Sequence, residues 1–401
     1  MAPSPSSLWL LHAIALASTS ISHATARDIA FPPLSPYASP FQNQDPLLAP
    51  LGGTPFTDKI GNAPWAGLTT FAKLPHVHCL AGADEFEEKG VEREGKERFD
   101  IAVLGAPFDT GVTARPGARY GPTGIRLGSR RLGGGYNIYT GESTYDNWAK
   151  IVDCGDAPLT VLDNTVALKQ LDRAHKVIAA RKTTSASYTT PRILTLGGDH
   201  TTTLSALRST AERWGPVSVI HFDSHLDTWD PDVLGGGISH YAGVNHGTFL
   251  HIAHEEGLIR NTSIHAGIRA PVFNRHKDLG NDARCGFEMV KAREIERIGI
   301  DGVIERLKKR VAGSKVYISV DIDVLDPAFA PATGTAEPGG WSSRELLSIL
   351  DGLTGLQVIG ADVVEVAPAY DNVGEPTTLA AAQVADSLLT LMVQTPVKTV
   401  E

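Results

Sequence analysis

The chain has 401 residues, of which 42% are hydrophobic and 20% are charged, and its formal net charge is −9 at pH 7. This composition supplies enough apolar material for a large core. The acidic balance offers no electrostatic footprint for nucleic acid or an anionic membrane surface. No internal apolar run approaches the roughly 20 residues that a membrane-spanning helix needs.

The N-terminus is typical of a secretory signal peptide. An apolar stretch, residues 8–17, is followed by Ala24-Thr25-Ala26, a sequence of small residues that suits cleavage. The first seven residues contain no Lys or Arg, so a disordered tail or another organelle signal is the alternative. We expect residues 1–26 to direct the chain into the secretory pathway, with a secreted, extracellular or vacuolar destination.

Two further segments differ from the rest of the chain. Residues 27–60 are rich in Pro, Ser, Gly and Asn, which predicts an extended arm without its own core. Residues 84–98 are densely charged, which predicts a solvated surface insertion. Residues 61–401 show no internal repeat and no second change in composition, so we expect one folded domain there.

The cysteines and one sequon bear on the secreted state. Cys79, Cys154 and Cys285 are too few for a disulfide framework, although one pair could form and leave one thiol. Asn261-Thr-Ser is an acceptor sequence for N-glycosylation, so we expect Asn261 to lie on the surface. Such sequons also arise by chance.

Short apolar runs alternate with helical patterns from residue 100 onward. The runs that predict strands are 101–104, 192–196, 217–222, 263–268, 316–320 and 357–361, and those that predict helices are 165–181, 201–213, 301–311, 342–351 and 376–394. This alternation indicates an α/β protein of three αβα layers with a central, mostly parallel sheet.

Unusual residues stand where three of these strands end. His200 follows Leu194-Thr-Leu-Gly-Gly-Asp, Asp223 opens Asp-Ser-His225-Leu-Asp227, and Asp321 opens Asp-Ile-Asp323. Extended chain projects residues i and i+2 to the same side, so each segment directs its ligands together. Ligands bind beyond the carboxyl ends of parallel strands, and we expect His200 to join from a neighbouring strand.

These six side chains predict a two-metal site. Four carboxylates close together repel one another at neutral pH, and bound cations relieve that repulsion. Oxygen and imidazole donors without thiolate favour an ion such as Mn²⁺ over structural zinc. Six ligands exceed the needs of one tetrahedral ion, and bridging carboxylates suit two. A single Asp-x-Asp would be a loop or cap, and His200 alone would be a core residue.

The same segments resemble the signature motifs of the ureohydrolase family, which contains arginases and agmatinases. The resemblance covers roughly residues 65–395 and is strongest in Gly197–His200, His221–Asp227 and Ser319–Pro331. It implies an arginase-like catalytic domain with two Mn²⁺ ions, and a trimer or hexamer. His200 and Asp227 would bind one ion, His225 and Asp323 the other, with Asp223 and Asp321 bridging them.

The resemblance also implies two catalytic residues. Asn245-His246-Gly-Thr-Phe matches the segment with the active-site His, and Asp362-Val-Val-Glu365 matches the segment whose Glu holds a guanidinium. Glu365 ends an apolar strand, where a carboxylate can pair bidentately with a planar guanidinium, and His246 can shuttle a proton. Alone, Glu365 would be part of a buried ion pair, and His246 would not stand out from its histidine neighbours.

The loop after Asp227 bears on the substrate. Trp229 stands where arginases place an Asn that reads the α-amino acid end, and Asp230 and Asp232 suit a cationic tail. The resemblance is closest to agmatinases, which implies conversion of agmatine to urea and putrescine, with Trp229 in the substrate site. A guanidino acid such as guanidinobutyrate is the alternative, with Arg115 or Arg119 as its carboxylate partner unless both support their loop. Arginine is a weaker alternative.

The expected mechanism assigns Glu365 to orient the guanidinium, Asp227 to help stabilise the tetrahedral intermediate and His246 to deliver a proton to the departing amine. Two other hypotheses stay open. A zinc deacylase of related fold would need only one Asp-His-Asp site. A secreted metal-binding protein without turnover would keep the ligands and release no urea.

Overall fold

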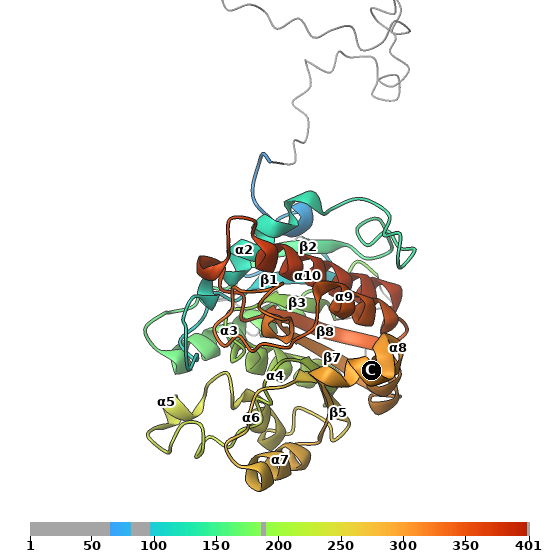
Figure 1. Ribbon diagram of the computed structural model, residues 1–401. Coiled ribbons are helices and arrows are strands. Elements are labelled where there is room, and N and C mark those ends of the chain that lie inside the picture. Colours follow the sequence, from blue (N-terminus) through green and yellow to red (C-terminus); the bar gives the residue numbers. More distant parts are fainter. Residues whose placement is uncertain (1–64, 82–96, 186–189, 399–401) are drawn as a thin grey trace, which may run out of the picture. The chain divides into compact units, whose positions relative to one another are not determined.

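The computed structural model describes residues 65–81, 97–185 and 190–398, and the centre of this part is a sheet of eight parallel strands. The strands lie in the order β2-β1-β3-β8-β7-β4-β5-β6 (Figure 1). Their bounds are Ile101–Gly105 (β1), Ile151–Asp156 (β2), Arg192–Leu196 (β3), Ser218–Phe222 (β4), Ser263–Ile268 (β5), Phe287–Lys291 (β6), Lys315–Asp321 (β7) and Gln357–Val364 (β8). Because every pair is parallel, the carboxyl ends of the four central strands meet at one edge.

Helices cover both faces of the sheet, which confirms the three-layer αβα fold (Figure 1). One face packs against α2 (Gly121–Gly128), α8 (Ile295–Arg310), α9 (Ser343–Gly352) and α10 (Pro376–Gln394). The other packs against α3 (Asn164–Ala179), α4 (Thr202–Trp214) and α6 (Phe249–Glu255). The polar helix α7 (Arg275–Arg284) lies against β6, and α5 (His240–Gly243) is a single turn.

Side-chain alternation along the strands builds the two apolar layers. In β7, Val316, Ile318 and Val320 belong to the core cluster beneath α8, α9 and α10, whereas Tyr317 belongs to the cluster beneath α4 and α6. Strands buried on both faces read as continuous apolar runs in the sequence. For this reason the central strands could be predicted from composition alone.

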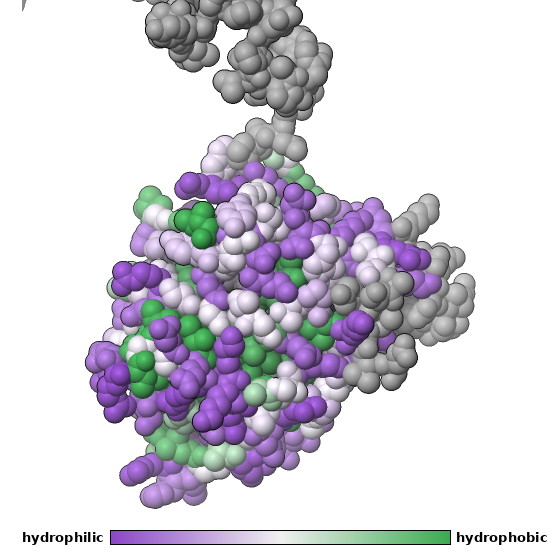
Figure 2. All heavy atoms as spheres, turned by 90° about the vertical axis from the view of Figure 1, so that its right-hand side faces the viewer, coloured by the Kyte–Doolittle hydropathy of each residue, from purple (hydrophilic) through white to green (hydrophobic). Residues whose placement is uncertain are grey.

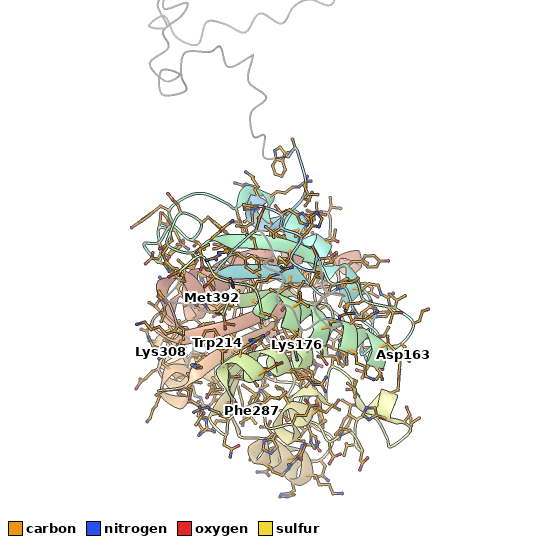
Figure 3. All side chains as sticks on the ribbon, turned by 180° about the vertical axis from the view of Figure 1, so that it is seen from behind. Asp163, Lys176, Trp214, Phe287, Lys308 and Met392 are labelled. Atoms are coloured by element: carbon orange, nitrogen blue, oxygen red, sulfur yellow. A yellow bond between two sulfur atoms is a disulfide. The ribbon has the colours of Figure 1, made fainter. Side chains whose placement is uncertain are left out.

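Local signals set where the helices begin. The carboxylate of Asp163 accepts a hydrogen bond from the Val166 N–H at the start of α3, the helix marked by Asp163 and Lys176 in Figure 3. At the start of α9, Ser342 and Glu345 form a capping box. These contacts satisfy backbone donors that have no partner inside the helix.

An additional segment covers the outer edge of β2. The Val77 N–H donates to the Asp153 carbonyl, and the Asp153 N–H donates to the Pro75 carbonyl. A disulfide between Cys79 and Cys154 joins the same two segments, and Cys285 is a buried free thiol. The three cysteines thus form one pair and leave one thiol over.

The six predicted strands are present, and β2 and β6 were missed. The edge strand β6 has a half-exposed pattern, with Glu288 and Lys291 in solvent, and β2 carries the buried charge of Asp153. The five predicted helices match α3, α4, α8, α9 and α10 within a few residues, except that α8 begins at Ile295 and has a left-handed residue, Gly299 with φ 68°, inside it. α2, α6 and α7 were not predicted.

The predicted signal peptide, residues 1–26, and the arm, residues 27–60, lie outside the described residues. So does the charged segment, apart from the exposed Glu97 and Arg98. Ala63–Glu401 forms one compact unit, and the predicted domain boundary at residue 61 stays a prediction. The face of this unit in Figure 2 mixes hydrophilic side chains with several small hydrophobic areas. Within the described ranges, every helix is too short or too polar to cross a bilayer.

Candidate metal centre and active site

The six predicted metal ligands converge at the carboxyl edge of the central strands. His200 follows β3, Asp223 and His225 follow β4, and Asp321 ends β7. One expectation about their strands is wrong: β3 does not neighbour β7 or β4, because β8 lies between β3 and β7. His200 reaches the cluster across the end of β8, after a two-glycine turn. A Cβ on Gly198 would lie 1.8 Å from the Phe108 carbonyl oxygen, so only glycine fits there.

The first group of donor atoms surrounds His200. Its Nδ1 lies 3.1 Å from Asp223 Oδ2, 3.1 Å from Asp227 Oδ2 and 3.4 Å from Asp321 Oδ2. All four side chains are buried, with at most 5% of any residue exposed. Three carboxylate oxygens and one imidazole nitrogen therefore face a common point, the geometry of a cation site.

The second group of donor atoms surrounds His225. Its Nδ1 lies 3.1 Å from Asp323 Oδ2 and 3.3 Å from Asp223 Oδ1. Asp223 thus presents Oδ2 to the first group and Oδ1 to the second, which is how a bridging carboxylate is placed. Asp321 reaches the first group through Oδ2, while its Oδ1 accepts the Asp323 N–H at 2.7 Å.

The protein itself does not satisfy the first group. His200 Nδ1 and Asp223 Oδ2 are buried and have no hydrogen-bond partner among the described residues. Unpartnered buried polar atoms are costly, and a cation between them removes the cost. The residues present therefore fit a pair of divalent metal ions.

Hydrogen bonds behind His200 set its tautomer. The Ser319 hydroxyl donates to Asp362 Oδ1 at 2.6 Å, so its oxygen accepts from His200 Nε2, 2.7 Å away. Nε2 therefore carries the ring proton, and Nδ1 presents a lone pair to the cluster. Asp362 also accepts from Thr203 and Tyr317 at 2.8 Å each. Ser319 and Asp362 were not singled out from the sequence, although a buried acid in the middle of an apolar strand is a signal.

Burial and mutual repulsion raise the pKa values of several carboxyls in the metal-free site. Burial, and then the Asp223 charge, raise the pKa of Asp227 to about 6. Burial and the charges of Asp323 and Asp223 raise the pKa of Asp321 well above its ordinary value. Burial opposes ionisation of Asp223 as well, but His221 and His200 hold its pKa well below the ordinary value. Such a crowd of acids needs compensating positive charge at neutral pH.

Two of the predicted catalytic residues have left-handed backbones. Asp227 has φ 55° and Glu365 has φ 61°, a region that non-glycine residues enter rarely. The sharp turns aim Asp227 back at His200 and end β8 so that Glu365 meets the cluster. Strain of this kind is held by the surrounding fold and gathers at functional sites.

Glu365 and His246 form a pair beside the cluster. Glu365 Oε1 accepts from His246 Nδ1 at 3.0 Å and from the His200 N–H at 2.8 Å. Its Oε2 is buried without a hydrogen-bond partner among the described residues. An unpaired carboxylate oxygen next to a metal cluster is where a guanidinium N–H can donate.

His246 is held from both ends. The Thr113 N–H donates to its Nε2 at 3.1 Å, which requires a lone pair there and places the ring proton on Nδ1. Burial lowers the pKa of His246, but the charges of Glu365 and of nearby carboxylates together outweigh burial and raise the pKa to about 9. The Thr113 hydroxyl lies 2.7 Å from the same Nε2 and can accept from it when the ring takes up a second proton, so His246 can hold a proton for later transfer.

A cavity of about 180 Å³ opens onto His246 and the metal-ligand candidates His225, Asp227 and Asp321. Its wall includes the apolar residues Trp229, Leu234, Pro271 and Phe273, and also Glu337, whose carboxylate lies 3.8 Å from His225 Nε2. Trp229 is 8% exposed, and its ring centre lies 5.8 Å from that of Phe273. The described lining contains no Lys or Arg. This lining suits an extended apolar chain with a cationic end.

The four charged residues predicted to bind the substrate tail lie elsewhere. Asp230 and Asp232 do not line the cavity, and Asp230 instead accepts the Asp232 N–H at 2.9 Å. Arg119 pairs with Asp109, and the guanidinium of Arg115 lies 5.7 Å from the centre of the Tyr370 ring. Neither arginine lines the cavity, whereas Glu337 does.

Comparison with known proteins identifies the family. The family model described as the arginase family matches residues 99–390. The chain belongs to the arginase family. It is 52% identical over 345 residues to "Putative agmatinase 1" of Schizosaccharomyces pombe, which covers 83% of this chain and 84% of that protein. It is 37% identical to the agmatinase of Escherichia coli, covering 72% and 86% of the two chains.

A solved structure from the family agrees with the fold. The proclavaminate amidinohydrolase of Streptomyces clavuligerus is 33% identical, with a TM-score of 0.69, over 83% of this chain and 99% of that chain. This match confirms the arginase-like fold and the ureohydrolase resemblance. The binuclear metal site of arginase-family enzymes corresponds to the two donor groups around His200 and His225.

Proposed function

We propose that this chain is an agmatinase: it hydrolyses agmatine to urea and putrescine with two Mn²⁺ ions per subunit. His200, Asp227, Asp223 and Asp321 would hold one ion, and His225 and Asp323 the other, with Asp223 shared. The observation that carries the proposal is Asp223, whose two oxygens face two different histidines. The similarity to the two agmatinases named above supports the reaction.

A bound pair of such ions supplies activated water and positive charge for hydrolysis. The residues around them position the substrate. Glu365 Oε2 is buried and unpaired, so it can accept one or two guanidinium N–H groups and fix the guanidinium plane. His246 lies against Glu365 and reaches the cavity, where it can give a proton to the departing amine. Asp227, held at φ 55°, lies between the cluster and the cavity and helps stabilise the tetrahedral intermediate.

The substrate tail is expected to lie along Trp229 and Phe273. Agmatine ends in an ammonium alone, which the carboxylate of Glu337 in the cavity wall attracts. Guanidinobutyrate ends in a carboxylate and arginine in a carboxylate beside an ammonium, and these carboxylates meet no Lys or Arg in the described lining. Burying an unpaired carboxylate beside Glu337 is unfavourable, and this supports agmatine over the guanidino acids.

Urea release from metal-loaded protein tests the proposal. Protein incubated with Mn²⁺ is assayed on agmatine, guanidinobutyrate and arginine at equal concentrations. The proposal expects the highest kcat/KM with agmatine. Preference for guanidinobutyrate would replace the substrate and keep the enzyme class. Two bound Mn²⁺ ions without urea from any guanidino compound would support a metal-binding protein, and one bound Zn²⁺ would support a deacylase.

We also propose that the chain matures in the secretory pathway. The Cys79–Cys154 disulfide requires an oxidising compartment to persist, and Asn261 of the sequon is exposed at the turn before β5. Removal of residues 1–26 and a glycan on Asn261 would follow. Mass spectrometry of protein purified from its native host, with and without endoglycosidase, tests both. An intact N-terminus and an unmodified Asn261 would contradict the proposal.

The family resemblance further supports a trimer or hexamer. Light scattering of purified protein gives the mass in solution. A mass of three or six chains is expected, and a monomer at micromolar concentration would contradict this assembly.

A further inference from the structure

A buried chain of polar groups lies behind the metal cluster. His221 on β4 and His265 on β5 are partners in the parallel register, and their Nδ1 atoms are 2.9 Å apart. His265 Nε2 lies 2.9 Å from Asp282 Oδ1 on α7, which also accepts the Thr228 hydroxyl at 2.7 Å. Each of these four residues is at most 2% exposed. The chain thus links α7 to the carboxyl end of β4.

One end of the chain points at a carboxylate of the cluster. His221 Nε2 lies 3.2 Å from Asp223 Oδ2, the oxygen that also faces His200 Nδ1. Neither His221 Nε2 nor Asp223 Oδ2 has a hydrogen-bond partner among the described residues. His221 Nε2 therefore lies beside the carboxylate that we assign as the bridge between the two ions, within 4.8 Å of the donor atoms of His200 and Asp227.

The other end of the chain fixes the ring of His221. A carboxylate only accepts hydrogen bonds, so His265 Nε2 carries a proton and donates it to Asp282. The His265 ring stacks on Phe287 with centres 4.1 Å apart, and the His221 ring stacks on His200 with centres 4.8 Å apart. For His221 Nε2 to face the Asp223 carboxylate with a proton, the proton between the two Nδ1 atoms must belong to His265. That hydrogen bond and the stacking hold both rings in place.

We infer that this relay, Asp282–His265–His221, is a positioning device for Asp223. None of its three residues lines the cavity beside Trp229 and His246. It holds the bridging carboxylate in the orientation that serves both ions, as groups behind metal ligands do in other metalloproteins. This inference rests on the proposed two-metal site. The competing explanation is that the four residues only fill space between β5 and α7.

Metal affinity without substrate separates these two explanations. The variants are Asp282→Asn, whose amide oxygen still accepts from His265, and Asp282→Ala, which has no acceptor. His175→Gln is the matched control, because His175 is a buried histidine, 1% exposed, whose side chain has one hydrogen bond within the described ranges, to Thr195 at 3.5 Å. Mn²⁺ affinity is measured by competition with a fluorescent chelator, and the melting temperature of each metal-free variant records its fold.

We expect Mn²⁺ affinity to fall about 10- to 100-fold in Asp282→Ala and less in Asp282→Asn, with His175→Gln unchanged. Losses in melting temperature alone, with wild-type affinity in both Asp282 variants, would overturn the inference. Should Asp282→Ala not fold, Thr228→Val and Asp282→Asn carry the comparison. The assay uses no guanidino compound, so an absence of urea release leaves its outcome intact. Wild-type protein that binds fewer than two ions would instead refute the proposed site.

Discussion

At the residue scale, tight turns at the ends of the strands place the metal ligands. The alternation of side chains along an extended strand predicted the correct ligands, but the segments that carry them are not extended throughout. Asp227 turns with φ 55°, and Asp323 lies in the 3-10 turn Ile322–Val324. The ligands converge because tight turns follow the strands, and single-residue turns of this kind leave little trace in composition.

The hydrogen bonds behind the ligands were also missed. Ser319 and His221 stand within apolar strands, where a polar side chain must find a partner. The sequence thus shows that such a side chain needs a hydrogen-bond partner, but it does not show which residue that partner is. The partner depends on strand register: Ser319 lies opposite Asp362, and His221 lies opposite His265.

The Ser319 hydroxyl is expected to support metal binding through His200. Ser319→Ala removes the acceptor of His200 Nε2 and frees the ring to turn. Mn²⁺ affinity should fall about 10- to 100-fold, as measured by chelator competition. Ser205→Ala is the control, since Ser205 is equally buried and, in the part of the chain that the structure describes, its hydroxyl donates to the Leu168 carbonyl, away from the metal ligands. Equal affinities in the two variants would show that Ser319 does not orient His200.

Glu365 is expected to act on the substrate and not on the metals. Glu365→Gln keeps an oxygen for the His200 N–H but removes the charge that faces the guanidinium. Loss of a charged hydrogen bond costs about 1.5–3 kcal/mol, so kcat/KM for agmatine should fall roughly 10- to 150-fold. The bound Mn²⁺ content should stay at the wild-type value. A variant with full kcat/KM would remove Glu365 from the substrate site.

The raised carboxyl pKa values predict a pH-dependent effect of metal on stability. The pKa of Asp227 is about 6 in the folded metal-free chain, against an ordinary value of 3.8. The folded state therefore binds this proton more tightly than the unfolded state, and the metal-free protein loses stability as pH rises from about 4 to about 6. Bound metal replaces the proton, but at low pH it must first displace it.

The increase in melting temperature caused by Mn²⁺ should therefore be larger at pH 8 than at pH 5. Thermal unfolding is followed at both pH values with Mn²⁺ and with a chelator. An increase at pH 5 equal to that at pH 8 would be inconsistent with protonated carboxyls in the metal-free cluster.

At the scale of elements, the buried apolar strands and helices were the ones that could be predicted from the sequence. The central strands are apolar on both faces and were predicted within a few residues, whereas the edge strands β2 and β6 carry charges and were not. The polar helix α7 was missed for the same reason, since seven of its ten residues are polar or charged and none of its buried residues is apolar. Its Asp282 nevertheless reaches the interior, which no helical periodicity of apolar residues could reveal.

The edge strand β2 is expected to depend on a buried ion pair. Arg126 of α2 meets both oxygens of Asp153 at 2.9 Å, and the two residues are 6% and 0% exposed. Arg126→Met leaves the Asp153 charge buried without its partner, which should lower the free energy of unfolding by about 3–5 kcal/mol in urea titrations.

The matched control for this pair is on the surface. Arg284 and Glu255 form an exposed pair at 2.5 Å, with side chains 46% and 53% exposed. Arg284→Met should cost about 0.2–1 kcal/mol, because solvent screens such pairs. Similar losses for both variants would show that burial does not strengthen the dependence on Arg126.

At the scale of the whole molecule, the αβα architecture could be predicted because alternating strands and helices admit few arrangements. The strand order could not, because β8 is the last strand in the sequence and yet lies in the middle of the sheet, between β3 and β7. That insertion places Glu365 between His200 and the Asp321–Asp323 turn. The last strand therefore supplies Glu365 to the active site, whereas the metal ligands follow the strands around it.

The central claim is that two cations occupy the acidic cluster, with Asp223 between them. Crystals grown with Mn²⁺ and measured at an X-ray energy where manganese scatters anomalously test it directly. We expect two anomalous peaks roughly 3.5–4 Å apart, one beside His200 and Asp227 and the other beside His225 and Asp323. A single peak, or peaks away from these residues, would contradict the account.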